Sequence, residues 1–252
     1  MTQAPSRAAP PASRLGRDYW RLWWANAISS TGDGAFVAAL PLLAVTITRD
    51  PRLVSVVTAA IYLPWLLLSL PAGAVVDRYD RATLMWRAQA VQAAVVTMIA
   101  VLVVVHQASI EVLAAGGLLL GSAEVIFSNA AQSVLPDLVP ASQLPKANGN
   151  LQVGLTVGET FLGPPVGSVL FALSRGLPFG LDSCSFFGSA ALLVGLPSRR
   201  GSAVTPAPMR AQIAEGLRYL ARHRLLKRHC ALKMIRTGPE ADADDPRLAG
   251  AE

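Results

Sequence analysis

Acidic side chains stand inside several of the long apolar segments of this 252-residue chain. Asp33, Glu124 and Glu159 each lie about halfway along such a segment, with no Lys or Arg at a comparable position, whereas Asp182 lies nearer the end of its segment. If these segments cross a membrane, an ionisable group at that depth is costly unless it is paired or hydrated, so each is a candidate functional residue. Asn26 is a weaker candidate, because amides in membrane helices also bond neighbouring helices. We predict that Asp33, Glu124, Glu159 and Asn26 bind substrate or protons.

Other kinds of chemistry have little support in the sequence. Intramembrane aspartyl proteases need paired catalytic aspartates within spans, but here the Tyr79–Asp80 dipeptide lies in a connection and Asp33 lacks a preceding Gly-x-Gly. No HExxH zinc motif is present, and the two cysteines, Cys184 and Cys230, provide neither a disulfide framework nor a thiolate metal site. We therefore expect no catalytic residues, no metal, no cofactor and no enzymatic activity.

The elements that must position these acids are predicted to be membrane helices. The chain is 52% hydrophobic and only 15% charged, whereas soluble domains have about 25% charged residues. A soluble helical bundle would show polar helix faces, and residues 90–105 show almost none. A helix needs roughly 20 mostly apolar residues to cross the hydrocarbon layer. Six stretches qualify: Leu22–Ile47, Leu53–Val76, Ala82–Val105, Glu111–Leu135, Ala147–Leu173 and Leu177–Pro197.

Basic residues at the ends of these spans predict the orientation. Lys and Arg are enriched in cytoplasmic connections. They gather at the N-terminal tail, the second and fourth connections and the segment after the last span, so we expect both termini in the cytoplasm and the protein in the cell membrane. The net charge of +6 then reflects topology and not a nucleic-acid partner. The residues on the predicted cytoplasmic side are Arg7, Arg14, Arg17, Arg21, Arg78, Arg81, Arg87, Lys146, Arg199, Arg200, Arg210 and Arg218, against Arg49, Arg52 and Arg175 on the other.

The connection between the second and third spans carries a recognisable pattern. Gly73, Asp77, Arg78 and Arg81 give the spacing GxxxDRxxR, which resembles the signature loop of the major facilitator superfamily at the same position. A glycine permits another helix to approach closely, an aspartate can accept N–H groups or pair with arginine, and arginines hold the turn at the cytoplasmic surface. The positive-inside rule alone would also place arginines here. We predict that these four residues form a gating loop.

The fifth span carries a second resemblance. Gly163, Pro164 and Gly167 match the GPxxG core of a motif similar to that of the superfamily's exporters. Residues 128–149 are also similar to the branch that includes siderophore and macrolide efflux proteins. The resemblance implies an all-α membrane fold of six helices, built as two inverted three-helix repeats that form one half of a major facilitator transporter. It also implies that small molecules are exported.

The repeats make the first and fourth spans structural counterparts, which places Asp33 and Glu124 at similar depths. If both face the central cavity, as these helices do in the family, they form an acidic site where protons compete with a cationic substrate. We therefore expect proton antiport of small amphipathic compounds. The alternative for Asp33, which lies between Gly32 and Gly34, is local: its carboxylate would bond backbone N–H groups at a kink.

The resemblance divides the chain into four regions. We expect a cytoplasmic tail over 1–19, the six-helix half over 20–197, a cytoplasmic linker with an amphipathic helix over 198–229 and an atypical polar tail over 230–252. Since the family has two such halves, we expect this chain to be truncated and inactive alone. It could instead pair with itself or with a separate C-terminal half, or be a membrane fragment without transport activity. Its expected partners are the lipid bilayer and a small-molecule substrate.

Overall fold

The computed structural model describes residues 15–197, and every regular element in that range is helical. The N-terminal tail up to residue 14 and the predicted regions 198–229 and 230–252 lie outside the described residues. The helices are α1 (Arg17–Ile47), α2 (Pro51–Val76), α3 (Arg81–Val104), α4 (Ile110–Leu138), the 3-10 turn η1 (Ala141–Gln143), α5 (Leu144–Thr156), the π-helical segment η2 (Val157–Leu162), α6 (Gly163–Leu173) and α7 (Leu177–Leu193).

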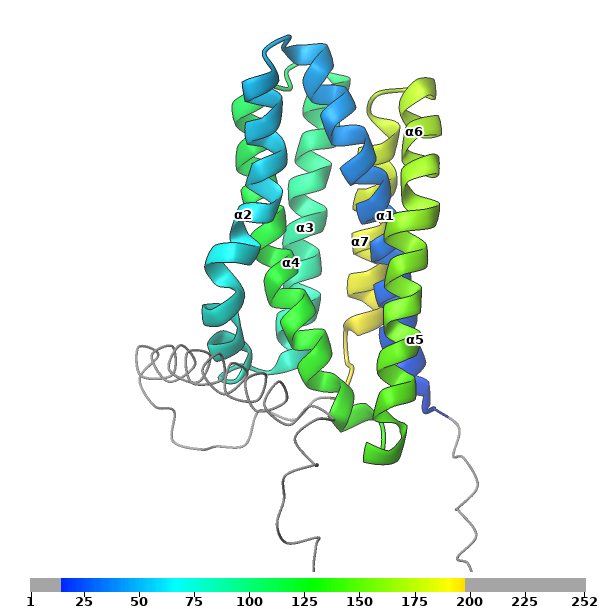
Figure 1. Ribbon diagram of the computed structural model, residues 1–252. Helices are drawn as coiled ribbons and strands as arrows, with labels where there is room; N and C mark the ends of the chain where they lie inside the picture. Colours follow the sequence, from blue (N-terminus) through cyan, green and yellow to red (C-terminus); the bar gives the residue numbers. More distant parts are fainter. Residues whose placement is uncertain (1–14, 198–252) are drawn as a thin grey trace, which may run out of the picture. The chain divides into compact units, whose positions relative to one another are not determined.

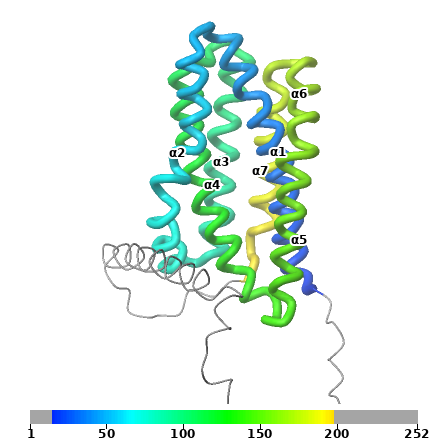
Figure 2. Tube along the Cα trace, in the orientation of Figure 1, coloured from blue at the N-terminus to red at the C-terminus, as the bar shows by residue number. Residues whose placement is uncertain are grey.

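These elements coincide with the six predicted spans to within a few residues. Helices α1 to α4 are long and apolar enough to cross a membrane. The fifth span is one rod made of α5, η2 and α6 end to end, which the tube in Figure 2 follows without a turn. The sixth span is shorter than predicted, because α7 has 17 helical residues and ends at Leu193.

Local sequence explains where several helices begin. Asp50 caps α2 by accepting a hydrogen bond from the backbone N–H of Arg52 at 2.9 Å, and Pro51 follows at the first helical position. Asp80 caps α3 in the same way, with the N–H of Thr83 at 2.8 Å. Short polar connections therefore stop each apolar helix and start the next.

The helices form two groups of three within the bundle (Figure 1). One group contains α2, α3 and α4, and the other contains α1, α7 and the α5–α6 rod. Helices α3 and α7 pack against each other and join the groups along one side. On the opposite side α1 makes few contacts with α2 and α4, so space remains between the groups.

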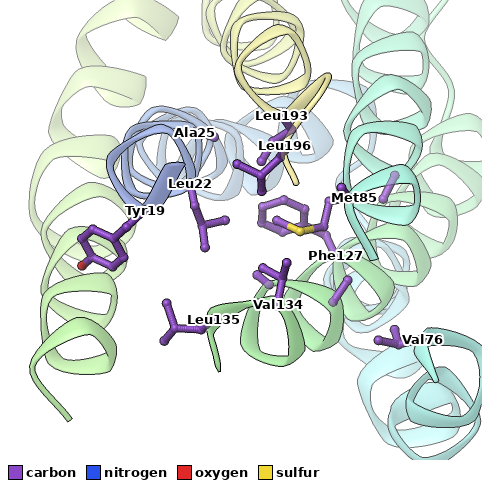
Figure 3. Close-up of a cluster of buried hydrophobic side chains, with 14 of the residues drawn as sticks. Tyr19, Leu22, Ala25, Val76, Met85, Phe127, Val134, Leu135, Leu193 and Leu196 are labelled. Carbon is purple, nitrogen blue, oxygen red and sulfur yellow. The ribbon is translucent and has the colours of Figure 1, made fainter. Parts of the chain in front are cut away.

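Two apolar clusters hold the bundle together. One gathers Leu22 of α1, Met85 of α3, Phe127 of α4 and Leu193 of α7 at the end where the chain enters α1 (Figure 3). The other lies further along the helices and contains the edge-to-face pair of Phe36 and Phe179, with ring centroids 5.5 Å apart. Both clusters join helices that are far apart in the sequence.

Polar contacts fix the same end of the bundle. Tyr19 donates from its hydroxyl to the carbonyl oxygen of Ala147 at 3.2 Å, and the Trp23 indole N–H donates to the carbonyl oxygen of Asn150 at 2.9 Å. Arg21 donates to the carbonyl oxygen of Val194, just after α7, at 2.8 Å. The start of α1, the start of α5 and the end of α7 therefore lie together, so both ends of the described range are on one side.

Candidate functional site

A cavity of about 210 Å³ lies in the space between the two helix groups. Four carboxylates line it, each from a different element: Asp33 from α1, Glu124 from α4, Glu159 from η2 and Asp182 from α7. None of the described residues that line it is Lys, Arg or His. The acids that the sequence singled out at mid-span thus meet at one site, together with a fourth acid that it did not select.

Glu124 is held by a neighbouring helix. Gln92 of α3 donates from its Nε2 to the Glu124 Oε2 at 3.1 Å. The Gln92 side chain is only 1% exposed and lines the same cavity. This bond fixes the position of the carboxyl group in the cavity wall.

Asp182 is the acid that the predicted binding site did not include. Its position in the segment placed it nearer the outer end of the span, yet it is 1% exposed and lines the cavity with Asp33. Ser185 bonds it at 3.3 Å, and a Cβ added to Gly32 of α1 would collide with the Asp182 and Ser185 side chains. The close approach of α1 to α7 at Gly32 therefore brings Asp182 inward. An acidic residue within an apolar segment was the signal that could have identified Asp182. It was not selected because its position in the sequence indicated a place near the end of the span.

Glu159 stands on the π-helical segment of the fifth rod. Pro164 and Pro165, which follow it, have no N–H to donate, so the ladder of i to i−4 hydrogen bonds cannot run through them. Such single-turn π segments occur frequently at functional sites. Glu159 is more exposed than the other three acids.

The GPxxG residues pack against α1. A Cβ added to Gly163 would lie 2.5 Å from the Cα of Gly34, and one added to Gly167 would collide with the backbone of Ala35. The two backbones thus touch, as small residues permit in membrane proteins. Pro164 lies in the first turn of α6 at the same crossing. These residues set the distance between Asp33 and Glu159 by bringing their helices together.

Asn26 lies outside the acidic cavity. It is 9% exposed and lines a second hollow of about 390 Å³, together with Gln132 and Asn148. Its backbone carbonyl oxygen accepts the Ser30 hydroxyl at 2.7 Å. Glu124 lines both the hollow and the cavity, so the two spaces share one carboxylate.

The predicted gating loop lies at the α2–α3 connection, away from the cavity lining. Asp77 is the exposed C-terminal cap of α2, while Asp80 caps α3. Arg81 makes an ion pair with Asp137 of α4 at 3.0 Å and also donates to the Ser133 carbonyl oxygen at 2.9 Å. The loop is thus fixed to the end of α4. Of the remaining predicted loop residues, Arg78 is exposed, and no atom of residues 15–197 lies within 4 Å of a Cβ added to Gly73.

Residues 9–236 match the family described as transmembrane secretion effectors, which covers most of the chain and belongs to the major facilitator group. The chain is a major facilitator superfamily protein. Among its curated relatives, a multidrug efflux pump, Tap, of Mycobacterium tuberculosis is 26% identical over 217 residues, which cover 81% of this chain and 51% of the pump. An uncharacterized MFS-type transporter of Mycobacterium bovis is 28% identical over 149 residues, which cover 58% of this chain and 33% of the relative.

Membership of the superfamily explains the apolar surface of the helices. On helix α2 the side chains of Leu66 and Leu67 are 79% and 61% exposed. Exposed leucines on one helix are unfavourable in water but favourable where the helix contacts lipid. The chain is therefore a multi-pass membrane protein of the major facilitator type. It spans about a third to a half of the length of these curated relatives.

Proposed function

We propose that this chain forms one wall of an exporter that exchanges protons for small amphipathic cations. The observation that carries the proposal is the meeting of four carboxylates on one cavity, with no cationic side chain among the described residues that line it. Carboxylates that lie together away from water need a neutralising partner, and a proton or a cationic substrate can serve. Competition between the two for the same groups is the basis of antiport.

The helix packing supports the proposed inverted repeats. Helix α1 packs on the α5–α6 rod and on α7, and α4 packs on α2 and on α3. If the first, second and third spans correspond to the fourth, fifth and sixth, the two neighbours of α1 therefore correspond to the two neighbours of α4. Helices α3 and α7, the third and sixth spans, contact each other. In this scheme Asp33 and Glu124 belong to counterpart helices, and both line the cavity, as the repeats predict.

A second six-helix half would supply the other wall of the cavity, whether it belongs to the same polypeptide or to a separate one. The lack of any described atom near a Cβ at Gly73 and the exposed apolar side chains of α2 and of the α5–α6 rod, including Phe161 and Val169, support such an arrangement. The printed name of the pump relative supports export as the direction. The relatives are named as transporters or pumps, in keeping with a function other than enzymatic catalysis.

We place the protein in the cell membrane with both termini in the cytoplasm. The shared side of the start of α1 and the end of α7 agrees with this orientation, as does the basic composition of that side. In this arrangement the Asn26 hollow, on the side of the α1 and α5 starts, is a vestibule through which a cation reaches Glu124. Labelling of a cysteine introduced at Asp77 from outside intact cells would overturn the orientation.

The proposal can be tested with the purified chain in detergent. In weakly buffered solution at neutral pH, binding of the permanent cation tetramethylrhodamine methyl ester should release protons, measured with a pH electrode. Asp33→Asn and Glu124→Gln should reduce the protons released per dye bound. Glu111→Gln is the matched control, because Glu111 lies in the first turn of α4, outside the cavity lining. If neither cavity variant differs from wild type in proton release, the acidic cavity is not the exchange site.

A further inference from the structure

The polar groups deep in the cavity are mainly hydrogen-bond acceptors. Ionised carboxylates accept but cannot donate. The Ser30 hydroxyl in the lining is already committed, since it donates to the Asn26 carbonyl oxygen at 2.7 Å. The other donors of the lining are the half-buried Ser128 hydroxyl of α4 and, on α2, Tyr62 and Trp65, which are 55% and 42% exposed. A ligand that reaches the acids therefore meets mainly acceptors there.

Gln92 adds a side-chain amide to the polar groups of the cavity, and only one of its two polar atoms has a hydrogen-bond partner among the described residues. Its Nε2 donates to Glu124, whereas its Oε1 is buried and accepts no hydrogen bond from any described residue. Buried carbonyl oxygens are nearly always paired, because an unpaired one loses its hydration without compensation. The unpaired oxygen belongs to a residue that lines the cavity, where a ligand can supply the missing donor.

The charge on Glu124 determines which atom of the Gln92 amide has no hydrogen-bond partner. If the amide were turned round, its carbonyl oxygen would face a carboxylate oxygen, and two acceptors repel each other. In the ionised state, which is the one that receives the cation, the carboxylate therefore holds Nε2 toward itself and leaves Oε1 for another partner. The other titratable groups of the cavity lining around Glu124 are Asp33 of α1, Tyr62 of α2, Glu159 of η2 and Asp182 of α7.

We propose that the Gln92 carbonyl oxygen accepts a hydrogen bond from an N–H group of the substrate, so that the cavity prefers organic cations with N–H donors to fully N-alkylated cations of the same charge. This inference rests on the proposed function and specifies its substrate class. A site built to bond a donor discriminates against an analogue that lacks it, because the buried acceptor is then left unpaired.

Gln89 provides a matched control on the same helix. It lies one turn from Gln92, is fully buried, and has both polar atoms unpaired, but it does not line the cavity. Gln92→Met and Gln89→Met remove the same amide with little change in side-chain volume. Only the first change alters the surface that a ligand meets.

Two fluorescent dyes separate the N–H donor from the charge. Rhodamine 123 and tetramethylrhodamine methyl ester are both monovalent methyl esters, but only the first has N–H groups. Fluorescence anisotropy titrations with the purified chain should show tighter binding of rhodamine 123. Gln92→Met should weaken rhodamine 123 binding about tenfold more than it weakens binding of the other dye, the effect of one hydrogen bond. Gln89→Met should change neither.

The outcomes distinguish this inference from the proposed function. If both dyes bind with proton release but Gln92→Met affects them equally or not at all, the role of Gln92 is wrong and the acidic cavity stands. If neither dye binds wild type, both proposals fail. Should Gln92→Met not remain monodisperse, Glu124→Gln decides, because loss of the orienting charge should reduce the preference for rhodamine 123. An unchanged preference would overturn the inference.

Discussion

The contact between Gly34 of α1 and Gly163 of the fifth rod predicts a large effect from one methyl group. A Cβ at position 163 would lie 2.5 Å from the Cα and 2.7 Å from the carbonyl carbon of Gly34. Both neighbours are backbone atoms and cannot rotate away. Non-bonded carbon atoms prefer separations of about 3.5–4.0 Å, so Gly163→Ala must push the two helices apart by about 1 Å.

The cost follows from overpacking a close contact. Inserting a methylene into a well-packed interior destabilises by about 1–3 kcal/mol. Replacing glycine by alanine in a helix also gains about 0.5–1 kcal/mol of conformational free energy, which must be subtracted. Gly180→Ala in α7 provides that correction, because no atom in the described part of the chain lies within 4 Å of an added Cβ there. The difference between the two variants therefore isolates the collision.

Thermal unfolding of the detergent-purified variants, followed by tryptophan fluorescence, measures this difference. Trp23 is a suitable reporter because its indole bonds the carbonyl oxygen of Asn150, which links α1 to α5. Using the scale for soluble domains of this size, Gly163→Ala should melt about 2–12 °C below Gly180→Ala. If the two variants melt together, the GPxxG residues do not pack on α1 as described.

Three further predictions concern the ends of the helices. A double-mutant cycle of Arg81→Ala and Asp137→Ala should give a coupling energy of about 0.5–1 kcal/mol in chemical unfolding, because their side chains are only 18% and 22% exposed; additive effects would show that the ion pair does not stabilise the α2–α3 connection. His106 has a φ of 58°, so His106→Val should lower the melting temperature and His106→Gly should not; the reverse order would contradict the left-handed conformation. Tyr19→Phe should lose about 0.5–1.5 kcal/mol of stability by removing the bond to Ala147, and an unchanged melting curve would show that the bond contributes nothing.

The sequence alone determined the spans and their order. Runs of apolar residues long enough to cross a bilayer, interrupted by capping residues such as Asp50 and Asp80, leave few alternatives to membrane helices, because backbone groups in lipid must bond within their own helix. The GxxxDRxxR and GPxxG patterns then indicated the superfamily to which the chain belongs. This information is local in the chain, so a single sequence contains it.

Only the tertiary structure decided which polar groups meet. Asp182 and Gln92 join the cavity because α7 and α3 approach α1 and α4 at particular heights and rotations, and neither quantity can be read from the residues of one helix. The same is true of Asn26, which lies in an apolar segment like Asp33 but faces a different space. Packing between helices, set by small residues such as Gly32 and Gly163, is a property of pairs of segments distant in sequence, and it fixes the site.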